Sequence, residues 1–325
     1  MVRRRSFRAP LIAAAALVFG VLCWFVAGWY LSGPLDEQIE FDVGKGEGLA
    51  ALADDLEAQG AITSAGMFRL RARLLGGSGE VKAGSFLIPK RASEATILEI
   101  LKGDKVIRRL LTIPEGMPSI MVAERLLANA DLVGPVDVPE EGSVLPDSYD
   151  WQKGETRAAV LKRMQAAMDR TLAELWAKRS SRTVAKTPQE AIILASIVEK
   201  ETGKPEERRM VAGLYSNRVR KGMLLQADPT IIYPITKGKP LGRRIRQSEI
   251  QAVNGYNTYT MVGLPKGPIT NPGRDSIAAV LDPAETDALF MVADGTGGHV
   301  FASTLQEHNA NVAKWFALRK ARGEL

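Results

Sequence analysis

The most hydrophobic part of the chain is an uncharged run over residues 11–31. About 20 apolar residues in a helix, each rising about 1.5 Å, span the hydrocarbon core of a bilayer, so this run predicts a transmembrane helix. Trp24, Trp29 and Tyr30 lie in its second half, where amphipathic rings suit the headgroup interface. A cleaved signal peptide is the alternative, but the length of the run and the missing small-x-small pattern after Tyr30 favour an uncleaved anchor.

Shorter hydrophobic periods follow in residues 37–105, where spacings typical of strands and of helices alternate. They predict a strand, two helices, a second strand and a third helix, in this order at residues 39–43, 49–56, 65–75, 84–88 and 92–101. This order is typical of a small α+β module, and Ser93 is placed to cap its last helix. The order resembles a LysM-like module, a fold associated with binding N-acetylglucosamine polymers. A packing domain without a sugar site is the alternative, because no row of exposed aromatic residues marks a sugar platform.

Residues 106–144 are predicted to connect this module to a larger domain at residues 145–325. Alternation at 107–112 predicts a strand, and helical spacing follows at 119–128. Acidic, proline and glycine residues between 133 and 145 indicate a loop or linker, so we place the boundary of the larger domain there. The predicted fold class is therefore α+β: a transmembrane helix, a LysM-like module and a mixed α+β domain.

A strong helix start follows in the larger domain. Thr187 can cap the helix, Pro188 fits its first position, and Glu190 completes a capping box three residues after the cap. The apolar spacing then continues to the end of the helix before Gly203.

One face of this helix ends in a carboxylate. Leu194, Ile197, Val198 and Glu201 lie at helical spacing, so Glu201 points toward the core. Partial burial and the negative end of the helix dipole both raise the pKa of such a carboxyl, which suits a general acid near neutral pH. An ordinary paired surface glutamate is the alternative. Glu199 lies on a different face of the same helix. It is more suited to orienting Glu201 or to pairing with a basic residue such as Arg208.

Most of the net charge of +6 comes from the N-terminus. Four of these charges precede the apolar run, on Arg3, Arg4, Arg5 and Arg8. The rest of the chain therefore has a net charge of only +2. A nearly balanced body argues against a nucleic-acid-binding protein. The positive-inside rule predicts that residues 1–10 are cytoplasmic and that the chain after Ser32 is extracytoplasmic.

Cysteine and histidine usage excludes several kinds of site. Cys23 is the only cysteine and lies in the apolar run, so the chain has no disulfide framework. His299 and His308 share no spacing typical of a zinc hydrolase. The sequence therefore predicts chemistry without a metal or another cofactor.

Two downstream segments combine polar and aromatic side chains. Gln226 and Asp228 follow an apolar run, and Tyr256, Asn257 and Tyr259 cluster rings with a carboxamide. Such mixtures suit a sugar site, where rings pack on pyranose faces and amides bind hydroxyl groups. Turn formation alone is the alternative explanation of the asparagines and glycines. The glycine-rich segment 294–299 lacks the lysine of a phosphate-binding loop and is not read as a nucleotide site.

The order of motifs after residue 145 resembles a known family, the endolytic murein transglycosylases (MltG or YceG-like). The motifs that carry the resemblance are Leu145-Pro-Asp-Ser-Tyr149, Ala195-Ser-Ile-Val-Glu-Lys-Glu-Thr202, Asn217-Arg218, Gly222-Met223, Gln226-Ala-Asp-Pro-Thr230, Tyr256-Asn-Thr-Tyr259, Gly263-Leu-Pro265, Asn271-Pro-Gly273, Val292-Ala-Asp-Gly295, Gly297-Gly-His299 and Glu307-His-Asn309. Ser148 and Lys266 depart from the family's usual threonine and proline.

The resemblance implies that Glu201 is the catalytic acid/base of an endolytic enzyme that leaves 1,6-anhydro-N-acetylmuramic acid ends and terminates the elongation of nascent strands. Side chains expected to bind the sugars are Gln226, Asp228, Tyr256, Asn257, Tyr259 and Asn271. Supporting roles behind them are expected for Glu199, Asn217 and His299. The family also implies an anchor in the inner membrane, an extracytoplasmic catalytic part and a complex with peptidoglycan synthases.

A lytic transglycosylase needs only one carboxyl, because the substrate supplies its own nucleophile. Protonated Glu201 would protonate the glycosidic oxygen between N-acetylmuramic acid and N-acetylglucosamine. It would then remove the proton of the muramyl C6 hydroxyl as that oxygen closes on C1. Two alternatives stay open: a muramidase with Asp228 as second carboxylate and water as nucleophile, and a noncatalytic peptidoglycan-binding scaffold.

Overall fold

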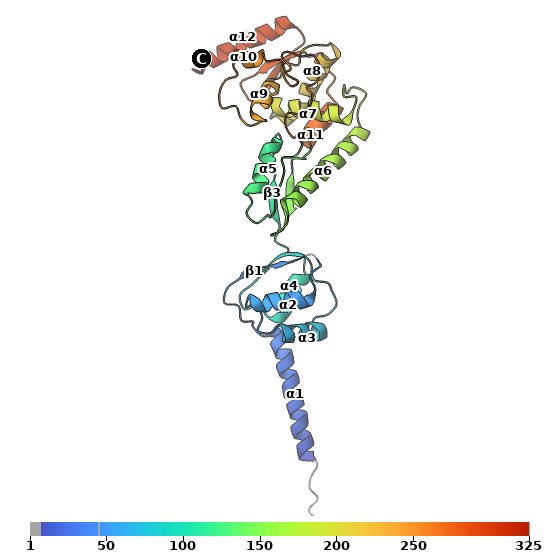
Figure 1. Cartoon of the computed structure of the whole chain (residues 1–325), viewed down its shortest axis with the longest axis vertical. Helices are drawn as coiled ribbons and strands as arrows, with labels where there is room; N and C mark the ends of the chain where they lie inside the picture. The colour runs from blue at the N-terminus through green and yellow to red at the C-terminus, as the bar shows by residue number, and fades with distance from the viewer. Residues whose placement is uncertain (1–7, 45, 325) are drawn as a thin grey trace, which may run out of the picture. The chain divides into compact units, whose positions relative to one another are not determined.

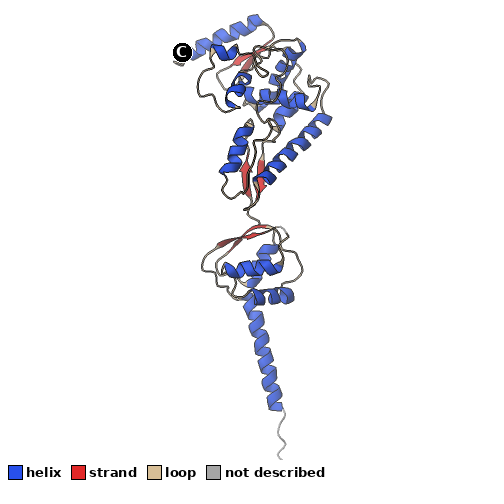
Figure 2. Cartoon of the chain, viewed as in Figure 1, coloured by secondary structure: helices blue, strands red, loops and turns tan. Residues whose placement is uncertain are grey.

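The computed structural model describes residues 8–44 and 46–324, which fall into two compact units, Met1–Arg109 and Leu110–Leu325. Both units mix helices and strands, as predicted (Figures 1 and 2). The predicted cytoplasmic charges Arg3, Arg4 and Arg5 lie outside the described residues.

The N-terminal apolar run forms a single helix, α1 (Arg8–Tyr30). Leu11–Tyr30 is long and apolar enough to cross a membrane. Most of its side chains are exposed, among them Leu17 and Phe19. A helix that is apolar on all sides and exposed over most of its length is typical of a membrane span. Length and composition therefore indicate a single-pass membrane anchor, while its orientation stays a prediction.

The rest of the first unit follows the predicted order of elements. These are β1 (Ile39–Val43), α2 (Leu49–Ala58), α3 (Ala65–Leu75), β2 (Gly84–Ile88) and α4 (Glu94–Lys102). The two strands pair antiparallel with Phe41 opposite Phe86. Ser93 caps α4 as predicted, because its hydroxyl accepts a hydrogen bond from the backbone N–H of Thr96 at 3.2 Å.

The core of the first unit includes the last turn of α1. Phe41, Phe68 and Phe86 are fully buried between the two paired strands and the helices. Trp29 of α1 is 3% exposed, and its ring centre lies 6.0 Å from that of Phe68. The apolar helix is therefore packed into the module that follows it.

The second unit begins with elements that cover its N-terminal part: β3 (Arg109–Thr112), α5 (Ser119–Ala128), β4 (Ser148–Trp151) and α6 (Arg157–Ala177). The predicted strand at 107–112 starts two residues later, while Ile107 pairs as an isolated bridge with Ser85. Segment 133–145 is a loop, as predicted, but Val144 within it is buried in the same core as Val122 of α5. Residues 110–144 thus pack with the larger domain, and the functional boundary near residues 133–145 stays a prediction.

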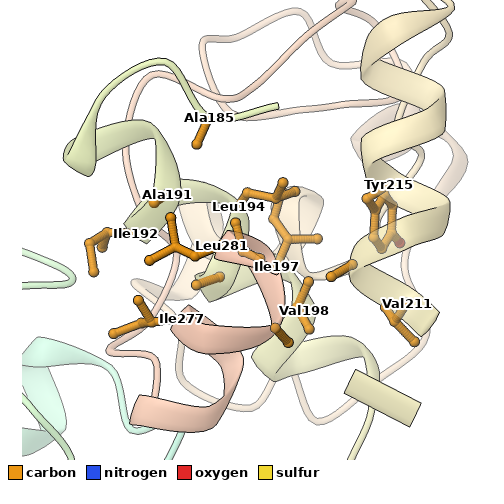
Figure 3. Close-up of a cluster of buried hydrophobic side chains, with 14 of the residues drawn as sticks. Ala185, Ala191, Ile192, Leu194, Ile197, Val198, Val211, Tyr215, Ile277 and Leu281 are labelled. Atoms are coloured by element: carbon orange, nitrogen blue, oxygen red, sulfur yellow. The ribbon is translucent and has the colours of Figure 1, made fainter. Parts of the chain in front are cut away.

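The remaining elements surround one buried helix. They are α7 (Pro188–Glu201), the short 3-10 helix η1 (Pro205–Glu207), α8 (Arg208–Arg220), α9 (Pro229–Thr236), α10 (Gln247–Ile250), α11 (Arg274–Leu281), β5 (Phe290–Ala293), β6 (His299–Ala302) and α12 (Leu305–Ala321). Every residue of α7 from Ala191 to Val198 is buried. Figure 3 shows Leu194, Ile197 and Val198 in the cluster formed with α8 and α11.

The start of α7 agrees with the sequence prediction except in one contact. Thr187 caps the helix, since its hydroxyl accepts a hydrogen bond from the backbone N–H of Glu190 at 3.1 Å, and Pro188 takes the first position. The predicted capping box is wrong: the Glu190 carboxylate accepts its hydrogen bond from Lys186 N–H, at 2.6 Å, and not from Thr187. The helix ends at Glu201, because Thr202 already has an extended backbone.

We expect Leu194→Ala to lower the free energy of unfolding of the second unit by about 2–5 kcal/mol, because Leu194 is fully buried and its loss leaves a cavity. Urea unfolding measures this difference. Leu127→Ala is the matched control, since Leu127 is 52% exposed, and it should cost no more than about 0.5 kcal/mol. Equal costs for the two variants would contradict the burial of α7.

Candidate active site

Glu201 lies at the wall of a cavity of about 390 Å³ in the second unit. The lining side chains come from the end of α7, from α8, from the loop before α9, from the loop after α10, from the β5–β6 hairpin and from α12. They are Glu201, Leu214, Tyr215, Arg218, Leu225, Gln226, Asp228, Tyr259, Met291, Val292, Ala293, His299 and His308. Most of these side chains are polar or ionisable, so the cavity is polar.

The position of Glu201 follows from the buried face of α7. Leu194, Ile197 and Val198 fix this face in the core, and Glu201 is the next position on it. One carboxyl oxygen, Oε1, is buried and has no hydrogen-bond partner among the described residues. A buried oxygen without a partner disfavours the ionised form of the carboxyl.

The pKa of Glu201 is raised from 4.5 to about 7. Burial is the largest cause, and the negative charge of Asp228 acts in the same direction. Hydrogen bonding from the Tyr215 hydroxyl and the charge of Arg218 oppose the shift without cancelling it. At neutral pH both protonation states of Glu201 are therefore well populated, which a group that first donates and then accepts a proton requires.

Two polar lining residues of α8 were not among the predicted site residues. Arg218 is 8% exposed, and its Nε donates to the carbonyl oxygen of Leu289 at 2.7 Å while Nη1 donates to that of Leu225 at 2.8 Å. Tyr215 is 2% exposed on the same face. Arg218 thus ties α8 to two loops that form the cavity wall.

Asp228 and Tyr259 form a hydrogen-bonded pair on the cavity wall. The Tyr259 hydroxyl donates to Asp228 Oδ1 at 2.6 Å. Behind them the hydroxyls of Thr230 and Thr258, both fully buried, lie 2.8 Å apart. These contacts join two segments that are far apart in the sequence, so the predicted residues Asp228 and Tyr259 meet at one site.

Gln226 has a left-handed backbone, with φ of +54°, which is uncommon for a residue other than glycine. Its backbone N–H donates to the Thr258 carbonyl at 3.1 Å, and Arg218 Nη1 lies 3.5 Å from its side-chain oxygen. Strained backbone of this kind persists where surrounding contacts fix it, and it is common at functional sites. Gln226, a predicted site residue, therefore lines the cavity with a backbone that its neighbours hold fixed.

Both histidines of the chain line the same cavity. His299 Nδ1 lies 2.8 Å from Glu207 Oε2, and the His299 backbone N–H donates to Glu207 Oε1 at 2.9 Å. His308 stacks on Phe290 with ring centres 5.2 Å apart, and burial lowers its pKa. Among the described residues, no group of three or more His, Cys, Asp or Glu side chains is placed to hold a metal ion.

The predicted sugar-binding residues Asn257 and Asn271 do not line the cavity. Both are fully buried. Asn257 Nδ2 donates to the carbonyl oxygens of Ile250 and Ala252 at 2.9 and 2.7 Å. Asn271 Oδ1 accepts from the backbone N–H of Val144 at 3.0 Å. Their carboxamides satisfy backbone groups of irregular loops, which would otherwise be buried without partners.

Tyr256 and Asn217 also lie outside the cavity lining. The Tyr256 ring packs against Tyr233, 4.8 Å away between centres, and Lys266 Nζ lies 5.0 Å from it. Asn217 Nδ2 donates to the carbonyl oxygen of Thr286 at 2.7 Å and so holds the segment that leads into β5. These contacts support the walls of the site and do not reach its interior.

Glu199 faces away from the cavity. Its Oε2 accepts from the backbone N–H of Gly273 at 2.8 Å, and its Oε1 lies 3.8 Å from Arg208 Nη2. The predicted ion pair with Arg208 is therefore confirmed. Glu199 anchors the start of α11 to the helix that carries Glu201.

Comparisons with known proteins agree with the motifs. The model of the YceG-like family matches residues 41–314. A protein of Streptococcus pneumoniae serotype 2 (strain D39 / NCTC 7466) named endolytic murein transglycosylase is 35% identical over 180 residues, which cover 54% of this chain and 32% of that protein. A protein of the same name from Bacillus subtilis (strain 168) is 31% identical over 189 residues, or 57% of this chain and 50% of that protein. The chain thus spans a third to a half of the length of these relatives.

A solved structure shares the fold. The crystal structure of a putative YceG-like protein from Listeria monocytogenes superposes with a TM-score of 0.53 at 24% identity, covering 84% of this chain and 98% of that one. The match of the family model over residues 41–314 confirms the family resemblance inferred from the motifs.

We expect Glu201→Gln to be more stable than the wild type at neutral pH. The unfolded carboxyl ionises near pH 4.5, whereas the folded one keeps its proton until about pH 7, so the wild type loses stability between these values. The difference should be absent below about pH 4.5 and reach at most about 3 kcal/mol above pH 7, by urea unfolding at a series of pH values.

The control for this series is Glu174→Gln. The exposed Glu174 has a pKa lowered to about 2, first by its hydrogen bond to Arg274 and then by that to Lys178. Its ionised form stabilises the fold, so the variant should be less stable than the wild type at pH 7, which is the opposite sign. A Glu201→Gln curve parallel to the wild type from pH 4.5 to 7 would show that Glu201 is not desolvated.

Proposed function

The chain belongs to the YceG-like family, and from this premise we propose that it is an endolytic murein transglycosylase that cuts the glycan strands of peptidoglycan. The observation that carries the proposal is the Glu201 carboxyl, which lines a polar cavity with a pKa of about 7 and a buried oxygen without a partner. The names of the streptococcal and bacillar relatives support the same activity.

In the first step Glu201 acts as a general acid. Its protonated carboxyl gives a proton to the oxygen that joins N-acetylmuramic acid to N-acetylglucosamine, and the bond from C1 to that oxygen breaks. The leaving sugar departs as an alcohol, and positive charge develops on the muramyl ring. Because burial keeps Glu201 protonated up to about pH 7, the acid is available near neutral pH.

In the second step the Glu201 carboxylate acts as a base. It removes the proton of the muramyl C6 hydroxyl while that oxygen bonds to C1, which closes the 1,6-anhydro ring and restores the protonated acid. No water is consumed, and the proton count balances over the two steps. One carboxyl therefore suffices.

The other polar groups of the cavity support the reaction around this carboxyl. The charge of Asp228 raises the pKa of Glu201 and faces the cavity in which the positive transition state forms. Tyr259 fixes the Asp228 carboxylate through its 2.6 Å hydrogen bond. Gln226 and His299 are the remaining predicted residues in reach of a bound sugar, as hydrogen-bonding groups on the cavity wall.

A water-using muramidase is the second candidate, because Asp228 shares the cavity with Glu201. In that enzyme Asp228 would activate water or attack C1, and the product would contain one more water. The hydrogen bond from Tyr259 occupies Asp228 Oδ1, the oxygen that would otherwise contact water or C1, and this favours the one-carboxyl mechanism.

We also propose the placement of the enzyme in the cell envelope. α1 anchors it in the inner membrane, with the N-terminal arginines in the cytoplasm and the chain after Ser32 on the other side. The first unit acts as a LysM-like glycan-binding module, which a cavity of about 770 Å³ between its helices supports. Peptidoglycan synthases that produce the nascent strands are the proposed partners.

Glu201→Gln should reduce glycan cleavage by about 100-fold or more while the fold is retained, because general acid–base catalysis is lost. The measurement is the rate of muropeptide release from purified sacculi, followed by mass spectrometry. Glu206→Gln is the control, since Glu206 is exposed five residues further on, and its rate should equal that of the wild type. Wild-type turnover by Glu201→Gln would refute the role of Glu201, and an inactive wild type would favour the scaffold.

Asp228→Asn distinguishes the two enzymatic candidates, because asparagine keeps the acceptor for Tyr259 and removes the charge. For the transglycosylase, the products stay anhydro sugars, and the loss of activity at high pH moves down by roughly one pH unit, because the pKa of Glu201 falls without its negative neighbour. For the muramidase, the reducing products carry an added water in the wild type and cleavage is abolished in the variant. The pH–rate profile and product masses decide between them.

A further inference from the structure

A second polar cavity lies in the first unit, where α1 meets the folded module. Its volume is about 340 Å³. The lining residues come from the end of α1, the segment that follows it, the loop before α3, and α3 and α4 themselves. They are Trp24, Gly28, Leu31, Ser32, Gly33, Pro34, Ala61, Ile62, Thr63, Arg71 and Glu94.

The wall of this cavity includes part of the membrane span. Trp24 and Gly28 belong to Leu11–Tyr30, the stretch long and apolar enough to cross a bilayer. At about 1.5 Å per residue, Trp24 lies roughly 9 Å before the end of that span. The folded module covers that end of the helix, since Trp29 is buried in its core, so the membrane boundary lies nearer Trp24, a residue type enriched at such boundaries. With α1 in a membrane, lipid headgroups therefore lie next to the cavity.

A buried ion pair forms the inner part of the cavity. Arg71 Nη1 donates to Glu94 Oε1 at 2.8 Å, and the two side chains are 7 and 8% exposed. The guanidinium carbon lies 5.5 Å from the ring centres of both Trp24 and Phe25. An arginine of the module is thus held against the last turns of the membrane helix.

This ion pair is not satisfied within the described chain. Arg71 Nε and Glu94 Oε2 are buried without hydrogen-bond partners among the described residues. Burial raises the pKa of Glu94, although Arg71 lies beside it. A buried polar atom without a partner costs about 1–3 kcal/mol, so a ligand that supplies both a donor and an acceptor would be stabilised here.

The helix also leaves space for the guanidinium. A methyl group added at Gly28 would lie 2.2 Å from Arg71 Nη2. Arg71 and Glu94 are the two ionisable groups among the described residues that line the cavity, and their charges cancel. A ligand without net charge therefore fits the site better than an anion.

We propose that this cavity binds the headgroup of a zwitterionic glycerophospholipid, whose phosphate accepts hydrogen bonds from Arg71 and whose ammonium donates to Glu94. The lipid joins the anchor to the module and fixes the module at the membrane surface. This inference rests on α1 spanning a membrane and is independent of the chemistry at Glu201.

The test uses the full chain in detergent, mixed with equal amounts of phosphatidylethanolamine and phosphatidylglycerol and analysed by native mass spectrometry. The wild type should retain one phosphatidylethanolamine with at least tenfold preference. Glu94→Gln leaves a net positive site and should reverse the preference toward phosphatidylglycerol. Arg71→Gln should lose the retained lipid. Added inorganic phosphate should not displace the lipid, because the acyl chains contribute to binding.

The matched control is Arg69→Gln on the same helix. Arg69 pairs with Asp54 at 3.3 Å, is 42% exposed and does not line this cavity, so its lipid retention should equal that of the wild type. Thermal unfolding shows whether Arg71→Gln is folded. If it is not folded, the reversed lipid preference of Glu94→Gln tests the headgroup site in its place. A wild type without preference, an unchanged preference in Glu94→Gln, or displacement by phosphate overturns the headgroup site. Failure of the wild type to sediment with vesicles overturns the anchor itself, and glycan cleavage by the same sample tests Glu201 separately.

Discussion

Keeping one carboxyl group away from water at the end of a buried helix is the constraint on which the second unit depends. The apolar face of α7 fixes the position of Glu201, and the same burial raises its pKa to about 7. Because a desolvated carboxyl destabilises the fold at neutral pH, the surrounding core must compensate. The core cluster that contains Leu194 and Val211 supplies this compensation with apolar side chains.

The polar surroundings of Glu201 depend on buried hydrogen bonds more than on regular structure. The segment at Gln226 is joined to the segment at Thr258, and Arg218 connects α8 to the loops beside it. Asn257 and Asn271 hold two further loops from within. Such fully engaged buried groups make irregular loops rigid, so that Asp228 and Tyr259 keep a fixed position beside the acid.

The sequence predicted those features that depend on local spacing. The elements of the first unit, the start of α7 and the orientation of Glu201 all follow from periodicity and capping. The buried positions of Asn257 and Asn271 do not follow from the sequence. A carboxamide can bind a sugar or a buried backbone group equally well, and only the tertiary structure determines which of the two it binds. The sequence could also have predicted Arg218. It follows Val211, Leu214 and Tyr215 in α8 at the same helical spacing at which Glu201 follows the apolar residues of α7. The packing of residues 110–144 with the larger domain depends on contacts that composition does not reveal.

The most direct test of this account is the pKa of the Glu201 carboxyl in the folded protein. A carbon-13 NMR titration of protein labelled at the glutamate carboxyls measures it, and the resonance missing from Glu201→Gln assigns it. The account predicts a midpoint of about 7. A midpoint near 4.5, the ordinary value for glutamate, would contradict it.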